Sequence, residues 1–303
     1  MTVAPGLTVE GIAIAKPERV VYPDAGITRA DVAGYYGRVA PRLLAGVAGR
    51  PLSLLRCPDG LAGERFFQRH PDAGWDPAVR RIELAEKDGT PGTYLYVENA
   101  RGLLELVRLG TLELHAWNAP AAAPDRPDRA VFDLDPGEGV AWPQVIGAAR
   151  EIRDLLAKRG LESFVRLTGG KGVHVVLPFA PGPDWATVKA FCETLARGLA
   201  EAWPERYVAS APKALRKERI FIDWLRNVRG ASSIASWSLR ARPGAPVAMP
   251  LRWSELAATA SGADYPLPRA LRRAAGLRRP PWDGWPAAAR QRLPAPASGS
   301  AGD

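Results

Sequence analysis

The stretch AVFDLDP, residues 130–136, decides how this 303-residue chain is interpreted. Its alternation of apolar and acidic residues predicts a short β-strand, in which Asp133 and Asp135 point to one face and the apolar residues to the other. Because neighbouring carboxylates repel each other, a divalent cation held between them would stabilise the pair. A second interpretation stays open, in which the acids mark a solvated strand end beside the turn at 136–139.

A third acid lies far along the chain. Asp223 interrupts the apolar segment IFIDWL, residues 220–225, which predicts another strand. Buried carboxylates are rare unless they are paired or bind a metal. Either Asp223 joins the acidic pair in holding two divalent ions, as in many phosphoryl-transfer enzymes, or it forms an ion pair with Arg226 or Arg219.

A glycine-rich turn, TGGKG at residues 168–172, joins two predicted strands. Turn amides form anion-binding nests, to which Lys171 adds a charge and Thr168 a hydroxyl. His174 alternates with valines on the second strand, so its side chain faces away from theirs. The spacing is not that of a Walker A loop, and a plain hairpin turn explains the glycines equally well. The lysine and the histidine favour a triphosphate site.

The chain is basic, with Lys+Arg 41 against Asp+Glu 32 and a formal net charge of +9. A positive field favours polyanionic partners, although abundant Ala, Arg, Gly and Pro are also typical of proteins from GC-rich genomes. The Phe66-Phe67 pair offers aromatic faces for base stacking, or one of its members packs in the core. Basic residues flank Asp223 and continue beyond it; they are Lys213, Arg216, Lys217, Arg219, Arg226, Arg229, Arg240 and Arg242.

Helices and strands are mixed without strict alternation, which predicts an α+β (mixed α/β) fold with a mixed sheet flanked by helices. We expect one domain over 1–290, with an N-terminal α/β subdomain (about 1–120), a loop at 116–130 and a catalytic part (about 128–290), followed by a disordered tail or linker stub at 291–303. The predicted helices begin after Thr28, span 102–109 and 143–158, and begin after Asp184; the predicted strands lie at 52–55, 93–97, 112–115, 163–167 and 173–178.

The two cysteines, Cys57 and Cys192, form no recognisable disulfide or metal-binding motif. No apolar run reaches the ~18 residues needed to cross a bilayer, and the first residues lack the features of a signal peptide. We therefore expect a soluble, cytoplasmic protein without a membrane partner.

Several blocks together make the chain resemble the polymerase domain of bacterial ligase D, the archaeo-eukaryotic primase-type polymerase of non-homologous end joining. The resemblance extends from about Val9 to Trp285 and rests on RPLSLLRCPDG, ERFFQRH, LGTLELHAW, DRAVFDLDPGEGVAW, SFVRLTGGKGVHVVLP and KALRKERIFIDWLRNVRGASSIASWSLRARPGAPVAMPLRW. It implies an archaeo-eukaryotic primase-like catalytic core and a nucleotidyltransferase, a template-dependent DNA or RNA polymerase that fills gaps and extends 3′ ends at double-strand breaks.

The resemblance also implies roles for individual residues. Two Mn²⁺ or Mg²⁺ ions are expected at Asp133, Asp135 and Asp223, and the incoming nucleoside triphosphate (NTP or dNTP) at His115, Thr168, Lys171, His174 and Arg240. DNA is expected at Lys16 and Arg19 (a 5′-phosphate), Phe66 and Phe67 (template bases), Arg216 (meeting of two ends) and Arg226. The expected partners are gapped or overhanging DNA ends with a 5′-phosphate, Ku and an ATP-dependent DNA ligase, in the bacterial nucleoid. In one departure, Leu55 stands where the family often has a cation.

Two other functions stay open. A metal-dependent nuclease uses the same set of acids, but the triphosphate-directed turn favours a polymerase. If the chain were a non-catalytic DNA-end-binding module that recruits a ligase, we would expect one of the three acids to be lost, whereas Asp133, Asp135 and Asp223 are all present. No ligase or nuclease domain is recognisable, so we expect either a stand-alone polymerase or one domain of a longer protein.

Overall fold

The computed structural model describes residues 7–86 and 88–294 of the chain. Its largest sheet is mixed and has the strand order β13-β14-β10-β12-β11-β16, in which β13 runs parallel to β14 and the other pairs are antiparallel. These strands are β10 (Arg129–Pro136), β11 (Phe164–Leu167), β12 (Val173–Pro178), β13 (Tyr207–Val208), β14 (Ile220–Asp223) and β16 (Pro250–Leu251). The predicted mixed sheet is confirmed.

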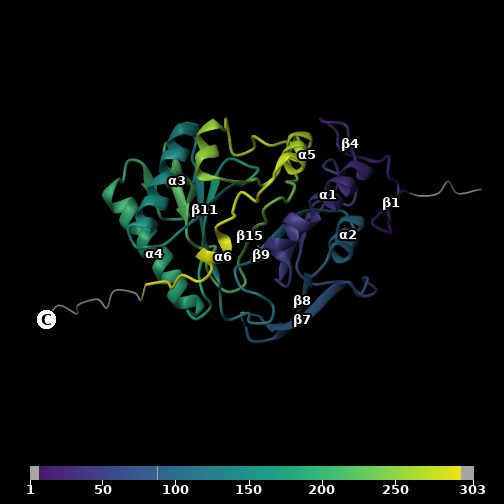
Figure 1. The fold of residues 1–303 in the computed structure, drawn as a ribbon, viewed down its shortest axis with the longest axis horizontal. Coiled ribbons are helices and arrows are strands. Elements are labelled where there is room, and N and C mark those ends of the chain that lie inside the picture. Colours follow the sequence, from purple (N-terminus) through teal and green to yellow (C-terminus); the bar gives the residue numbers. More distant parts are fainter. Residues whose placement is uncertain (1–6, 87, 295–303) are drawn as a thin grey trace, which may run out of the picture.

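Helices α3 (Trp142–Ala157) and α4 (Trp185–Ala202) pack against this sheet, and Figure 1 shows them together at one end of the molecule. Asp184 caps α4 as predicted, because its carboxylate accepts a hydrogen bond from Thr187 N at 2.8 Å. The apolar residues that alternate with the acids of β10, Phe132 and Leu134, are fully buried. The other face of β10 is thereby left for the acids.

A second sheet has the order β15-β9-β5-β6 and belongs mostly to the N-terminal part. Its strands are β5 (Leu52–Arg56), β6 (Phe66–Gln68), β9 (Thr111–Trp117) and β15 (Ser232–Ile234). Helices α1 (Arg29–Val47) and α2 (Ala100–Arg108) contact each other, and α2 contacts β9. The remaining strands form the hairpins β1 (Thr8–Val9) with β2 (Ile12–Ala13), β3 (Val20–Tyr22) with β4 (Ile27–Thr28), and β7 (Val79–Ala85) with β8 (Pro91–Val97). Helix α1 begins after Thr28, as predicted, with a capping box formed by Thr28 and Asp31.

The C-terminal half returns to the N-terminal half at two places. Strand β15 pairs with β9, and α5 (Leu267–Gly276) contacts α1, where Arg42 donates hydrogen bonds to Ala274 O at 2.8 Å and Leu277 O at 3.3 Å. The late helical elements are η1 (Lys213–Arg216) and η2 (Trp253–Ala258), both 3-10 helices, and α5 (Leu267–Gly276) and α6 (Trp285–Ala288). The two predicted parts of the chain are therefore interleaved, and one hydrophobic cluster runs through both.

The end of strand β14 and the start of the predicted tail differ from the predictions for a physical reason. Strand β14 ends at Asp223, not at Leu225, because the Asp223 carboxylate accepts Leu225 N at 2.9 Å and turns the chain. Gln291, which we placed in the tail, donates hydrogen bonds to Pro178 O at 2.6 Å and Glu162 O at 2.9 Å. Residues 295–303 of the predicted tail lie outside the described residues. Of the helices in the described ranges, none combines the length and apolar character needed to cross a membrane.

Candidate active site

The three acids lie side by side on adjacent strands. The register pairs Asp133 of β10 with Asp223 of β14 on one side and with His174 of β12 on the other. Directly opposed residues of antiparallel strands lie on the same face, and Asp135 shares that face because it follows Asp133 by two residues. Strand pairing alone therefore brings together side chains that lie up to 90 residues apart in the sequence.

Burial and mutual repulsion act against the charge of this cluster. Burial, followed by the charges of Asp133 and Asp223, raises the pKa of Asp135 to about 6, and burial also raises the pKa of Asp223. Burial opposes ionisation of Asp133 as well, but contacts with His174 and Arg226 outweigh it and hold the pKa of this carboxyl below its usual range. Burial lowers the pKa of His174 to about 4, so the imidazole is neutral at neutral pH.

Two arginines supply the positive charge between the acids. Arg226 Nε lies 3.1 Å from Asp223 Oδ2 and 3.6 Å from Asp133 Oδ2, and Arg216 lies 3.8 Å from Asp135 Oδ2. The ion pair with Arg226, the alternative weighed for Asp223, is thus present together with the acidic cluster. As these side chains stand, no group of three His, Cys, Asp or Glu residues is arranged to hold a metal ion within 7–86 and 88–294.

The donor set nevertheless suits hard divalent cations, which prefer carboxylate oxygens. Asp133 Oδ1 is buried and, although His174 Nε2 lies 3.3 Å away, it accepts no hydrogen bond of good geometry. A buried carboxylate oxygen without a donor is costly, and a metal ion would satisfy it. Coordination requires the guanidinium of Arg226, half exposed at 43%, to swing away from the two acids that it bridges.

The glycine-rich turn lies against the acidic strand. A Cβ atom on Gly172 would stand only 2.0 Å from Leu134 O, so only glycine allows this approach. The Thr168 hydroxyl holds the turn, because it donates to Gly172 O at 3.0 Å and accepts Gly170 N at 3.2 Å. Lys171 is exposed and lines the cleft in front of the acids.

Glu113 is a buried acid that the sequence analysis missed. It lies on β9, where its carboxylate accepts hydrogen bonds from His115 Nε2 at 2.8 Å and Ala241 N at 2.8 Å and lies 3.1 Å from Arg240 Nε. Arg240 in turn donates to Thr168 O at 2.5 Å. Glu113 thus connects three of the predicted nucleotide-binding residues. An acid inside the apolar segment LGTLELHAW is the same signal that singled out Asp223.

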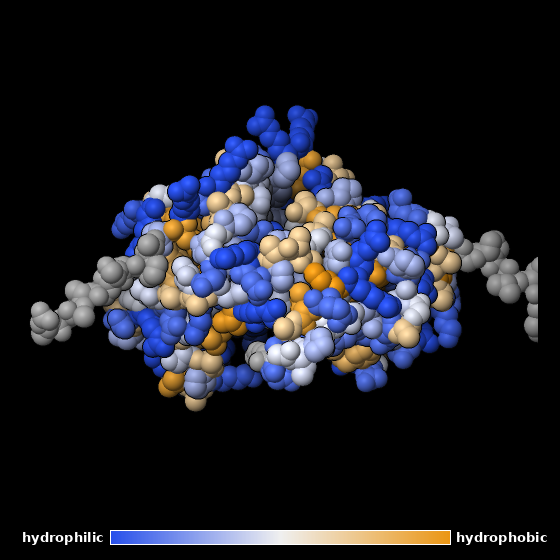
Figure 2. Space-filling view, turned by 90° about the horizontal axis from the view of Figure 1, so that it is seen from below, coloured by the Kyte–Doolittle hydropathy of each residue, from blue (hydrophilic) through white to orange (hydrophobic). Residues whose placement is uncertain are grey.

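A cleft of ≈ 790 Å³ lies in front of these groups. It is lined by the acids Glu113, Asp133 and Asp135 and by twice as many cations, which are Arg65, Arg69, Lys171, Arg226, Arg240 and Arg242. Asp223 is not in the lining but adjoins it through Asp133. On the face of the molecule shown in Figure 2, hydrophilic side chains prevail and apolar ones are scattered between them. The cleft therefore has the size and charge of a site for a nucleoside triphosphate.

The predicted DNA-binding residues are not all at the cleft. Phe67 lines it, 63% exposed, with its ring 5.6 Å from that of His115, whereas Phe66 points away and packs against Arg56. Lys16 and Arg19 precede β3 outside the cleft lining, and Arg19 forms a salt bridge with Asp59.

Arg216 ends η1, with its guanidinium 4.0 Å over the ring of Phe221. The loop that carries Arg216 touches the turn after β10, because Gly137 N donates to Arg219 O at 2.9 Å. These placements leave the roles of the predicted site residues as predictions.

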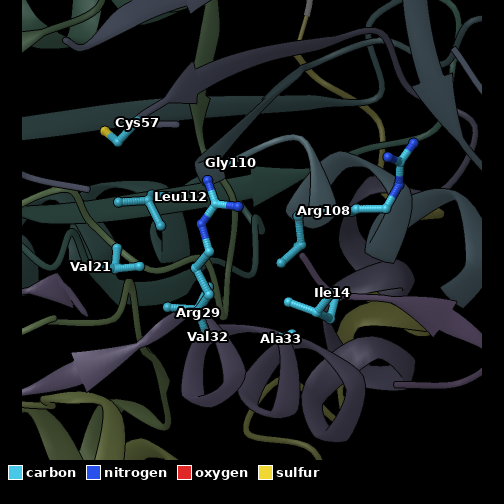
Figure 3. A pocket seen from close by; sticks show the side chains of 10 residues that line it. Ile14, Val21, Arg29, Val32, Ala33, Cys57, Arg108, Gly110 and Leu112 are labelled. Atoms are coloured by element: carbon cyan, nitrogen blue, oxygen red, sulfur yellow. The ribbon is translucent and has the colours of Figure 1, made fainter. Parts of the chain in front are cut away.

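A much smaller cavity of ≈ 20 Å³ lies between α1, α2 and β9 (Figure 3). Its wall is mostly apolar, and the side chain of Arg29 extends past Leu112 towards Gly110. Burial raises the pKa of the Cys57 thiol at its edge to about 11, so this cysteine is not an activated nucleophile. The cavity has room for about one water molecule, so the large cleft is the candidate site.

Three acids on adjacent strands of a mixed sheet, beside a cationic cleft, define the class of the protein: a nucleotidyltransferase with a primase-type fold. The model of the family "LigD, primase-polymerase domain" matches residues 28–282, and the chain belongs to this family. The predicted resemblance is thereby confirmed, together with the predicted fold and the polymerase class. The family's setting is non-homologous end joining.

Individual relatives agree with the family. The chain is 36% identical over 288 residues to the multifunctional non-homologous end joining protein LigD of Pseudomonas aeruginosa, covering 94% of this chain and 34% of that protein. It is 33% identical to the LigD of Mycolicibacterium smegmatis, covering 82% of this chain and 33% of that one. The polymerase domain from Mycobacterium tuberculosis ligase D, solved in complex with DNA, has a TM-score of 0.81 at 31% identity and covers 87% of this chain and 94% of its own. The chain therefore spans about a third of the length of these full-length relatives.

Proposed function

We propose that the chain is the template-dependent polymerase that fills gaps and extends 3′ ends at DNA double-strand breaks. The observation that carries the proposal is the register of β10 with β12 and β14, which gathers three carboxylates and His174 on one face of the sheet. Asp133, Asp135 and His174 form the floor of a cationic cleft, and Asp223 adjoins it. Phosphoryl transfer needs mainly positioning and charge stabilisation, and this floor offers both.

Two Mn²⁺ or Mg²⁺ ions would be held by Asp133, Asp135 and Asp223. Bound there, they would activate the primer 3′-hydroxyl and neutralise charge on the phosphates during in-line displacement. Arg226, released from the carboxylates, would remain at the wall of the cleft and face the phosphates or the DNA backbone.

The chain's own side chains would bind and orient the triphosphate. Lys171 carries an exposed ammonium at the glycine-rich turn, where backbone amides add anion-binding dipoles. Arg240 and His115 are held towards the cleft by Glu113. Phe67, exposed beside His115, offers a stacking face to a template base. Together these contacts would position the triphosphate and the template base, and positioning is a large part of what the protein itself is expected to contribute.

The proposed partners are DNA ends with a 5′-phosphate, gapped or overhanging, and nucleoside triphosphates. We also propose that Ku and an ATP-dependent DNA ligase act with the chain in the nucleoid; the names of the relatives support the setting of non-homologous end joining. Lys16 and Arg19 are the candidates for the 5′-phosphate; Arg19 would exchange Asp59, itself 67% exposed, for the phosphate.

Primer extension on a labelled, gapped duplex with Mn²⁺ and nucleotides tests this function. We expect the parent protein to lengthen the primer, and Asp135→Asn to lower the rate by at least about a hundredfold because a metal ligand is lost. The exposed Asp283→Asn is the matched control and should extend at the parent rate. Extension by Asp135→Asn at the parent rate would refute the assignment of the acids.

The same assay separates the two alternatives. A nuclease would shorten the labelled strand whether or not nucleotides are present. An end-binding module would shift the DNA in a gel without changing its length in either condition. The turn at 168–172 and the excess of cations in the cleft favour lengthening that depends on added nucleotides.

A further inference from the structure

Arg166 on β11 is a buried cation that the proposed mechanism has not used. Only 6% of the residue is exposed, and in the described part of the chain its guanidinium forms no salt bridge with a carboxylate. Burial, and then the charge of Arg129, lower the pKa of Arg166 to about 9. Burying a cation without a carboxylate partner is costly, so its position calls for a functional explanation.

The register places Arg166 directly behind the candidate triphosphate site. Arg166 of β11 is opposite His174 of β12, which is opposite Asp133 of β10, which is opposite Asp223 of β14. Opposed residues of antiparallel strands share a face, so these four side chains form one row across the sheet. Arg166 ends the row on the side away from the acids.

The hydrogen bonds of the row fix the orientation of the imidazole. A guanidinium nitrogen of Arg166 lies 2.7 Å from His174 Nδ1, and another lies 3.3 Å from Ser236 Oγ. Because a guanidinium only donates, Nδ1 must accept, and the proton of the neutral ring is on Nε2. That nitrogen points towards Asp133 and the cleft. If the His174 imidazole were rotated by 180° about its Cβ–Cγ bond, it would lose the hydrogen bond from Arg166 and direct a C–H group at the cleft.

We propose that Arg166 is a positioning residue for the nucleotide site, which holds the His174 ring with its Nε2–H directed at the phosphates of the incoming triphosphate. The identity of the ligand in this inference rests on the proposed function, whereas the orientation of the His174 ring does not depend on it. Arg166 itself does not touch the substrate in this assignment, because His174 stands between the guanidinium and the acids.

The neighbouring Arg129 provides a matched control. Both arginines line the same internal cavity of ≈ 30 Å³, but Arg129 donates to Asp128 at 3.3 Å and Gly46 O at 3.1 Å and has no bond to His174. Arg129→Met and Arg166→Met therefore remove similar volume and charge from the same cavity. Only Arg166→Met should change the environment of His174.

Nuclear magnetic resonance of the imidazole nitrogens tests the orientation without nucleotide or metal. The chain has only three histidines, so the His174 signals can be assigned with one His174→Gln variant. In the parent protein we expect the proton on Nε2 and a hydrogen-bonded Nδ1. Arg166→Met should shift the Nδ1 signal to that of an acceptor without a donor, and Arg129→Met should leave it in place. A parent protein with the proton on Nδ1 would overturn the proposal, whether or not any variant folds.

Steady-state extension with Mn²⁺ tests the consequence for the substrate. Arg166→Met should raise the KM for the nucleoside triphosphate about tenfold, the size expected for one disordered hydrogen bond to a charged group, and change kcat by less. An Arg166→Met variant with the parent KM and the parent Nδ1 signal would also overturn it. If the parent protein extends no primer, the proposed function is refuted. The nuclear magnetic resonance experiment still tests separately whether Arg166 orients the His174 ring.

Discussion

Replacing Glu113 by glutamine should destabilise the protein in a way that depends on pH. Burial opposes ionisation of Glu113, but the hydrogen bond from His115 and the charge of Arg240 outweigh burial and lower the pKa of the carboxyl from its ordinary 4.5 to about 2. The side chain is almost fully buried, so solvent screens this effect little. At about 1.4 kcal/mol per pKa unit, the charged form contributes about 3 kcal/mol to the free energy of unfolding.

The sign of the pH dependence follows from the lowered pKa. A carboxyl whose pKa is lower in the folded state contributes its full stability above pH 4.5 and loses it as the pH falls towards 2. The difference in unfolding free energy between the parent protein and Glu113→Gln should therefore be about 3 kcal/mol at pH 7 and about half of that near pH 3. Urea denaturation followed by tryptophan fluorescence measures it.

A surface glutamate serves as the control for this experiment. Glu98 pairs with Arg80, and both side chains are about half exposed, at 51% and 52%. Glu98→Gln should change the unfolding free energy by less than about 1 kcal/mol at any pH. A difference for Glu113→Gln that stays constant from pH 7 to pH 3 would refute the reasoning, because the loss would then come from packing and not from the charge.

Two further predictions concern the acidic strand. Arg226→Gln should bind Mn²⁺ roughly three- to tenfold more tightly in isothermal titration calorimetry, because no guanidinium has to leave the carboxylates. Unchanged or weaker binding would contradict the inference that the Arg226 guanidinium occupies the place of the metal ions. Gly172→Ala should lower the unfolding free energy by about 2 kcal/mol or more, because its Cβ would stand 2.0 Å from Leu134 O. Gly182→Ala, with nothing within 4 Å of the added carbon, should change it little, and equal effects of the two substitutions would count against the close approach.

Local patterns were sufficient to predict the individual elements that carry the site. The alternation in AVFDLDP placed Asp133 and Asp135 on one face, and β10 has this arrangement. The capping residues Thr28 and Asp184 begin helices α1 and α4, as expected. These signals are local because they depend on hydrogen bonds and side-chain directions within a few residues.

The pairing of strands could not be predicted in this way. Nothing near Asp133 indicates that Asp223, 90 residues later, is its neighbour, or that β15 joins a sheet of the N-terminal half. Such pairing is selected by the packing of the whole domain. Arg166 was missed for the same reason, because an arginine in a strand gains its meaning only from the residue opposite to it.

Under the proposed function, the charges of the site favour binding of metal ions and triphosphate together over binding of either alone. Without added cations, the buried Asp133 and Asp223 and the partly exposed Asp135 share two arginines, and partial burial with the neighbouring acids raises the pKa of Asp135 to about 6. Divalent ions would take over the carboxylates and release Arg226 towards the cleft, which increases the positive charge that faces a nucleotide. The triphosphate adds negative charge at the same place, so each partner lowers the electrostatic cost of binding the other. Arg226, which contacts Asp133 and Asp223 before the metal ions bind, would then become part of the substrate site.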